Sequence, residues 1–206
     1  VSAAKLAEES SYIEINKCNE PIGKQDQYSA AFGGFNFIQF NIDGSVKVEP
    51  LIFKRKTKEL LKKNLLLFYT GITRSASDIL KKQVNNISIS TKKRSMLGEM
   101  VRLAHKLKAD LQENRLDTFG DILHQNWIIK KELTEDISNT QIDKWYDTAL
   151  KNGATGGKLL GAGGGGFLLF FAPKEKHSNI ILALKQLEPV PFNFDTEGSK
   201  IIFVHQ

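Results

Sequence analysis

The chain has 206 residues, 41% of them hydrophobic, which is enough to bury a core in one domain or two small ones, and no stretch approaches the roughly 18 consecutive apolar residues of a membrane span. Its net charge of +6 could suit a nucleic-acid partner, but the basic residues fall in separate short runs and the aromatic residues are mostly Phe in apolar stretches, so we expect no nucleic-acid partner. The single cysteine, Cys18, excludes an intrachain disulfide framework, and with no signal pattern at the start it predicts a cytoplasmic protein without a membrane partner.

The first third of the chain predicts a helix followed by short strands. Residues 3–15 have the composition of a helix. Residues 34–39 and 46–53 are strand-like runs, and the Asp-Gly pair within residues 41–45 is a strong hairpin signal between them. After a lysine-rich stretch, residues 64–69 form a short apolar run that predicts a strand.

Helices dominate the middle of the sequence. Residues 75–78 form a capping box that predicts the start of a helix. Residues 95–111 place apolar side chains on one helical stripe, which we expect to be core: Met96, Leu97, Met100, Val101, Ala104, Leu107 and Leu111. Helices follow at about 118–132 and at 140–151, and Asn152-Gly153 stops the second of them.

The tail predicts a strand at 167–172, a helix at 174–187 and a strand at 200–204. Pro189 and Pro191 interrupt the connection before the last strand. The chain is therefore mixed α/β, without an internal repeat.

A glycine run at residues 158–167 is the most informative feature of the sequence. Glycine tolerates positive φ and lets backbone N–H groups approach a ligand closely, and here the run opens into the apolar stretch 167–171. We therefore interpret it as an anion-binding loop before a buried strand. A flexible linker is the alternative, but linkers are polar on both sides. The predicted loop residues, preceded by Lys158, are Gly161, Ala162, Gly163, Gly164, Gly165 and Gly166.

Two familiar phosphate-binding motifs do not fit this run. A Walker A loop needs Gly and a following hydroxyl residue where this sequence has Asn152 and Leu159. The dinucleotide-binding fingerprint follows a strand and opens a helix, whereas here a predicted helix precedes the loop and a strand follows it.

A second cluster, residues 21–37, combines Asp26 with amides, a lysine and paired glycines. Taken alone, Asp26 is typical of a helix cap or turn. Together with a distant anion loop it matches what phosphoryl transfer to a hydroxyl requires, namely a group that orients or deprotonates the acceptor and dipoles that hold phosphate charge. Arg74 precedes the predicted helix at 75, where it could contact an anion or form a structural salt bridge.

These segments resemble the GHMP small-molecule kinases. Residues 158–167 resemble the third motif of that family. Residues 23–28, followed by 32–35, resemble the segment that carries the catalytic aspartate in its heptose phosphate kinases, whereas galactokinases share only the Asp-Gln core. Thr70-Gly71 with Arg74 agrees with the resemblance, which covers nearly the whole chain.

The resemblance implies an α+β fold in which the end of an S5-like N-terminal domain, residues 1–53, is followed by a ferredoxin-like α/β C-terminal domain, residues 54–206. The family's first motif and its Ser/Gly-rich second motif are not found here, and the chain begins without Met inside an expected helix. We therefore expect this chain to be the C-terminal portion of a longer kinase.

The resemblance also implies a reaction. It is the ATP-dependent phosphorylation of the anomeric hydroxyl of D-glycero-D-manno-heptose 7-phosphate to the 1,7-bisphosphate, with Mg²⁺ accompanying ATP and with metal ligands that this sequence does not identify. Asp26 would accept or orient the hydroxyl proton. The other implied substrate-binding residues are Lys24, Gln25, Tyr28, Gly33, Gly34, Arg74 and Lys158.

Two other functions remain open on the sequence. A galactokinase-like or fucokinase-like sugar 1-kinase needs no site for a phosphate on its substrate. A non-catalytic relative would bind sugar or nucleotide without forming ADP. The oligomeric state is not indicated.

Overall fold

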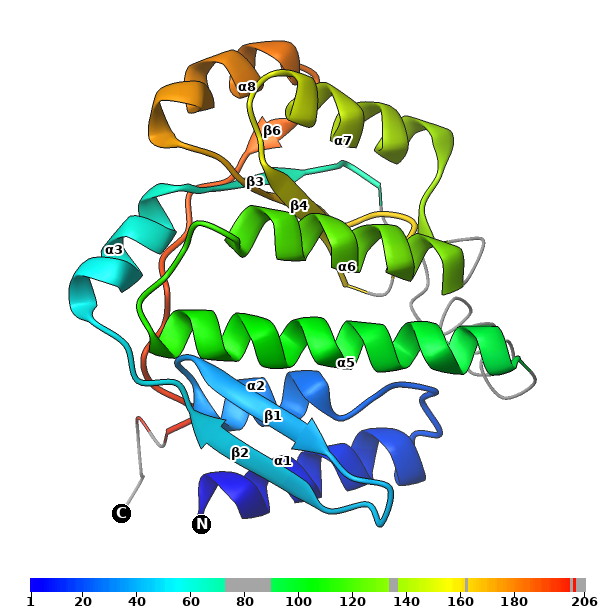
Figure 1. Cartoon of the computed structure of the whole chain (residues 1–206). Coiled ribbons are helices and arrows are strands. Elements are labelled where there is room, and N and C mark those ends of the chain that lie inside the picture. Colours follow the sequence, from blue (N-terminus) through cyan, green and yellow to red (C-terminus); the bar gives the residue numbers. More distant parts are fainter. Residues whose placement is uncertain (73–89, 134–136, 162, 201, 203–206) are drawn as a thin grey trace. The chain divides into compact units, whose positions relative to one another are not determined.

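The computed structural model describes residues 1–72, 90–133, 137–161, 163–200 and 202 (Figure 1). The chain divides into two compact units, Val1–Ile52 together with the segment from Asn193, and Phe53–Phe192. The domains 1–53 and 54–206 remain a prediction, and the units differ from them because the segment from Asn193 packs with the first unit. Among the described helices, none combines the length and the apolar character needed to cross a membrane.

The first unit packs two helices against a β-hairpin. Helix α1 (Ala3–Tyr12) continues into a π-helical turn (Ile13–Lys17), as the sequence predicted for this stretch, and α2 (Gln25–Phe32) follows. The strands β1 (Asn36–Phe40) and β2 (Val46–Pro50) are antiparallel. Burial of the apolar side chains between helices and hairpin stabilises the unit; its small core contains Ala7, Tyr28 and Ala31.

The hairpin turn confirms the Asp-Gly prediction. Gly44 has φ +84, a left-handed conformation that glycine adopts without steric cost. The Asp43 carboxylate accepts hydrogen bonds from the Ser45 N–H at 2.9 Å and from its hydroxyl at 2.6 Å. The turn is therefore closed by local chemistry, which explains why its sequence signal was sufficient.

The second unit contains a four-stranded antiparallel sheet with the order β4-β5-β3-β6. Its helices and antiparallel sheet confirm the expected α+β class. The strands are β4 (Gly156–Leu160), β5 (Phe167–Phe171), β3 (Leu65–Tyr69) and β6 (Glu188–Pro189). The helices are α3 (Arg55–Lys63), α5 (Thr91–Gln112), α6 (Phe119–Leu133), α7 (Thr140–Lys151) and α8 (His177–Ala183), with a 3-10 turn at Lys174–Lys176.

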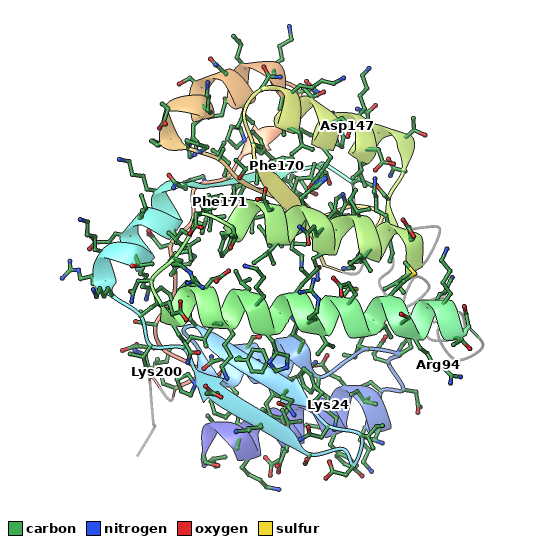
Figure 2. The ribbon with its side chains drawn as sticks, in the orientation of Figure 1. Lys24, Arg94, Asp147, Phe170, Phe171 and Lys200 are labelled. Carbon is green, nitrogen blue, oxygen red and sulfur yellow. The ribbon has the colours of Figure 1, made fainter. Side chains whose placement is uncertain are left out.

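Successive residues of β5 serve the two faces of this sheet (Figure 2). Phe170 is fully buried and packs against Phe68 and Tyr146 in the main core. Phe171 packs instead against Phe119 of α6. The apolar run that the sequence predicted as a strand is therefore buried on both faces.

The core stripe predicted for α5 is correct only in part, since Leu111 is buried and Met96, Leu97, Met100 and Leu107 are partly buried. Val101 is 57% exposed and Ala104 is also exposed, whereas Leu103, which the predicted stripe omits, is 1% exposed. The most buried apolar residues of the helix are Leu103 and Leu111, which are two steps of four residues apart and therefore lie on the same face. Apolar residues on several faces of this helix left the phase ambiguous in the sequence.

The elements of the tail were predicted only in part. Helix α7 has the bounds that the sequence predicted, with Asn139 capping its first turn and Asn152-Gly153 ending it. The helix expected at 174–187 is shorter, since it consists of the 3-10 turn and α8. The helix expected from Ser75, and all but residues 200 and 202 of the strand expected at 200–204, lie outside the described residues; those two are not in a strand.

A buried carboxylate ties the end of α5 to the start of α6. Asp110 is 3% exposed and accepts hydrogen bonds from Lys106 Nζ (2.6 Å), Thr118 Oγ1 (2.6 Å) and an Arg115 terminal nitrogen (2.5 Å). These donors outweigh the effect of burial and hold the pKa of Asp110 below its ordinary range. Because the folded-state pKa is lowered, the stabilisation is complete above about pH 4, the ordinary aspartate pKa, and is lost as the pH falls below it.

We expect Asp110→Asn to lower the free energy of unfolding by about 1–3 kcal/mol at pH 7, because the donors lose their charged acceptor. The difference from the unchanged protein should shrink at pH 3. Urea denaturation at both pH values measures this. Asp147→Asn, which changes an exposed carboxylate on α7, is the control and should change stability by less than about 0.5 kcal/mol. A loss that stays the same at pH 3 would contradict the role of the Asp110 charge.

Candidate active site

Asp26 lies in the first turn of α2, with an exposed side chain. Lys24 occupies the N-cap position and makes no side-chain capping hydrogen bond, so the helix start leaves N–H groups without such a cap. A carboxylate in the first turn is favourable there because of the helix dipole. The geometry therefore leaves Asp26 accessible for catalysis, while a purely structural role at the helix start also fits.

Lys24 and Tyr28 face a pocket in the first unit. The pocket has a volume of about 630 Å³ and is lined by α1, α2 and the hairpin turn. Lys24 Nζ donates a hydrogen bond to the Gly44 carbonyl at 3.4 Å, and burial, with a smaller effect of the Glu8 carboxylate, raises the pKa of Tyr28. The buried hydroxyl of Ser11 lines the pocket and has no hydrogen-bond partner within the described part of the chain.

Asp26 does not line this pocket. Lys24 and Tyr28 are four residues apart and share one side of the helix start, whereas Asp26 lies between them in sequence and on another side. Gln25 is exposed as well. The structure thus brings together two of the predicted substrate-binding residues and separates them from the predicted catalytic one.

Gly33 and Gly34 follow α2 with φ values of +60 and +70. A Cβ on Gly33 would lie 2.2 Å from the backbone carbon of Glu197, so this glycine is needed for close packing of the tail segment. Ser199 N–H donates to the Ala30 carbonyl at 2.9 Å and holds the same segment. A contact of Gly33 or Gly34 with substrate remains a prediction. Packing of the tail segment already explains why residue 33 is glycine, and the sequence did not reveal this.

The glycine loop of the second unit, residues 161–166, connects β4 to β5. The N–H of Gly164 donates to the Ile137 carbonyl and that of Gly166 to the Ile72 carbonyl, both at 2.9 Å. The Gly166 carbonyl in turn accepts from the N–H of Thr70 at 3.0 Å and from its hydroxyl at 2.9 Å. Two neighbouring segments therefore fix the loop.

Close packing explains part of the glycine content of this loop. A Cβ on Gly163 would lie 2.9 Å from the α-carbon of Ile137, and one on Gly165 would lie 2.3 Å from the Ile72 carbonyl oxygen. The amides of Gly163 and Gly165 have no hydrogen-bond acceptor among the described residues. The loop therefore offers N–H donors to a ligand, but its glycines are also needed for packing. The sequence had suggested a ligand-binding role alone. Ala162 and Arg74, both predicted site residues, lie outside the described residues.

Lys158 lies in the middle of strand β4, where the sequence predicted the beginning of the loop. The strand was missed because glycine is a poor strand former. The fold requires glycine at Gly156, since a Cβ there would lie 1.9 Å from the Gly120 carbonyl oxygen of α6. Burial lowers the pKa of the Lys158 ammonium.

Lys130, on α6, is a candidate site residue that sequence reasoning missed. Its Nζ donates to the Gly161 carbonyl at 3.2 Å, which places it at the glycine loop. Burial, and then the charge of Lys158, lower the pKa of Lys130 to about 8. The sequence offered only a Lys-Lys pair at a helix end, which is typical of a solvated face.

The described residues contain no cluster of three His, Cys, Asp or Glu side chains that could hold a metal ion. Their lysines and loop amides are donors that suit phosphate oxygens and do not suit a cation. The described residues of the site therefore do not form a magnesium site by themselves.

Comparisons of this chain with known proteins agree on one family. Residues 107–189 match the family model described as GHMP kinases C terminal. The D-glycero-alpha-D-manno-heptose 7-phosphate kinase of Campylobacter jejuni is 37% identical over 199 residues, which are 96% of this chain and 58% of that protein. The bifunctional fucokinase/GDP-fucose pyrophosphorylase of Arabidopsis thaliana is 32% identical over 73% of this chain and 14% of that protein.

A solved structure agrees with these sequence matches. The crystal structure of a D-glycero-D-manno-heptose 1-phosphate kinase from Bacteroides thetaiotaomicron superimposes with a TM-score of 0.68 at 26% identity, and the match covers 98% of this chain and 57% of that one. The chain thus spans a little more than half of the length of these two heptose phosphate kinases.

Proposed function

Because the chain belongs to the GHMP kinase family, we propose that its protein is an ATP-dependent kinase that phosphorylates the anomeric hydroxyl of D-glycero-D-manno-heptose 7-phosphate to the 1,7-bisphosphate. The observation that carries the proposal is the likeness to the Campylobacter heptose 7-phosphate kinase, which extends over nearly the whole chain. It includes the Asp26 segment as well as the glycine loop. Residues 1–53 and 54–206 would be parts of the two domains of such a kinase.

We assign to Asp26 the role of binding and aligning the acceptor hydroxyl. In phosphoryl transfer with a loose transition state, positioning and charge stabilisation supply most of the catalysis, so a carboxylate that aligns the hydroxyl is sufficient. Asp26 would accept the hydroxyl proton as the bond to the transferred phosphorus forms and the bond from phosphorus to the ADP oxygen breaks. Its exposed position at the start of α2 leaves room for a sugar.

We assign the binding of the phosphate groups to residues of the second unit. The loop amides of Gly163 and Gly165, with Lys158 and Arg74, are cationic or N–H donors of the kind that bind phosphate oxygens. ATP brings magnesium to such reactions and supplies the transferred phosphoryl group. Lys24 and Tyr28 would contact a part of the sugar away from the reacting hydroxyl, since Asp26 does not line their pocket.

The test measures ADP release from Mg·ATP by the protein with four separate acceptors. These are D-glycero-D-manno-heptose 7-phosphate, the unphosphorylated heptose, galactose and fucose. Turnover with the 7-phosphate alone is the expected result. Turnover with fucose or galactose alone would replace the proposal with the corresponding sugar 1-kinase, and ligand binding without ADP formation with any acceptor would replace it with a non-catalytic relative.

A further inference from the structure

Lys158 lies on the face of the sheet that α6 covers. Alternate residues of a strand share a face, so Lys158 is on the same side of β4 as Gly156. A Cβ on Gly156 would run into the Gly120 carbonyl oxygen of α6, which shows which side that helix packs on. The register places Lys158 opposite Leu169, so it is flanked by an apolar neighbour across the sheet.

Helix α6 runs alongside β4 in the same direction, and Figure 1 shows the two elements next to each other. Gly120 contacts Gly156 at one end, and Lys130 contacts Gly161 at the other. The helix advances about 15 Å between its two contact points, and the strand advances about 17 Å between its own. Lys158 lies between these points, beside the part of α6 that runs from Gly120 to Lys130.

The two ammonium groups share an environment that lacks a compensating carboxylate. Among the described residues, neither Lys130 nor Lys158 forms an ion pair, and each is only partly exposed. Lys131, the next residue along α6, pairs with the Asp143 carboxylate at 2.9 Å. Partly buried like charges destabilise a fold unless an opposite charge joins them, so the pair of Lys130 and Lys158 is suited to receive an anion.

The neighbouring loop supplies further donors for the same anion, since the amides of Gly163 and Gly165 have no acceptor among the residues that the structure describes. We propose that Lys130 and Lys158, beside the glycine loop, together bind a phosphate group. That this phosphate belongs to the kinase's substrates, either the sugar phosphate or ATP, rests on the proposed function. The anion site itself rests only on the geometry of the second unit.

A structural role for Lys130 predicts a different outcome. A lysine in the last turn of a helix interacts favourably with the helix dipole, so its removal would lower stability. If the lysines form an anion site, by contrast, removing one partly buried charge should raise the stability of the unliganded protein. Stability without ligand and affinity for phosphate therefore distinguish the two roles.

The experiment titrates the full chain with inorganic phosphate by isothermal titration calorimetry. Lys130→Met and Lys158→Met are expected to weaken binding by about tenfold or more, since each removes a charge-assisted hydrogen bond. Lys131→Met is the matched control, because it makes the same change at the next residue and removes only the pair with Asp143; its affinity should stay within about twofold. Lys130→Arg keeps the charge and should retain binding.

A thermal melt without phosphate completes the test. Lys130→Met should melt at or above the temperature of the unchanged protein, and added phosphate should stabilise the unchanged protein but not this variant. The proposal would be overturned if the unchanged chain bound no phosphate, or if both methionine variants bound phosphate as tightly as the unchanged chain does. A lower melting temperature of Lys130→Met with undiminished phosphate affinity of Lys158→Met would assign the lysines to structure instead.

Separate titrations with heptose 7-phosphate and with ATP identify the source of the phosphate, since only the ligand whose phosphate occupies the pair should lose affinity in both methionine variants. If neither ligand loses affinity, the assignment to substrate is wrong. If the two methionine variants lose phosphate binding but the unchanged protein phosphorylates none of the four sugars, the anion site is supported and the kinase proposal is refuted. If the unchanged protein phosphorylates the heptose 7-phosphate and both variants keep normal turnover and affinities, the kinase proposal is supported and the anion site is refuted.

Discussion

Replacing Asp26 with asparagine is expected to lower kcat by at least about a hundredfold while the affinity for the sugar changes little. Asparagine has nearly the same shape and can still accept a hydrogen bond, but it cannot take a proton and carries no negative charge to align the acceptor hydroxyl. Because Asp26 is exposed, the substitution buries no unpaired group and should leave the fold intact. Steady-state kinetics of the intact kinase and a sugar titration measure the two effects separately.

Glu9→Gln is the control for this experiment. It removes one exposed negative charge from α1 in the same unit, where Glu9 pairs with Lys5, and it should leave kcat within about twofold. Near-normal turnover of Asp26→Asn would show that the aspartate acts as a helix-start residue. In that case the catalytic assignment would have to move to another residue.

The elements that the sequence predicted well are those determined by local chemistry. Helix α7 has its capping residue at Asn139 and its stop at Asn152-Gly153, and the hairpin turn is closed by Asp43 and Ser45 within a few residues. Such signals need no knowledge of the rest of the fold. The α+β class followed from the resemblance, whereas the predicted elements alone indicated a mixed α/β chain, and the antiparallel sheet bears out the α+β class.

The features that were missed depend on contacts between distant segments. Strand β4 contains two glycines that argue against a strand. Gly156 is required because α6 packs directly on the backbone there, and Gly157 because a Cβ would run into Leu169 and Phe170 of β5. Lys130 reaches the loop only because α6 runs along that strand, so a Lys-Lys pair gave no indication of it. The second lysine of the pair, Lys131, forms a partly buried ion pair with Asp143.

Gly156→Ala is expected to lower the free energy of unfolding of the second unit by about 2–3 kcal/mol, as overpacking of a tight interface does. The added methyl group would lie 1.9 Å from the Gly120 carbonyl oxygen and 3.1 Å from His124 Cβ, so α6 and β4 must move apart. That movement also displaces Lys158 from Lys130, and phosphate binding should weaken with stability. Chemical denaturation followed by the fluorescence of Trp127 and Trp145, together with the phosphate titration, measures both effects.

Gly98→Ala is the matched control, since it adds the same methyl group at an exposed position of α5 with no heavy atom within 4 Å. Alanine is the better helix former, so this change should stabilise the protein by up to about 1 kcal/mol. The two substitutions are therefore expected to have opposite signs, and the comparison separates packing from the general cost of replacing glycine. If Gly156→Ala were as stable as Gly98→Ala, α6 could not lie directly against β4, and the proximity of Lys130 to Lys158 would lose its structural basis.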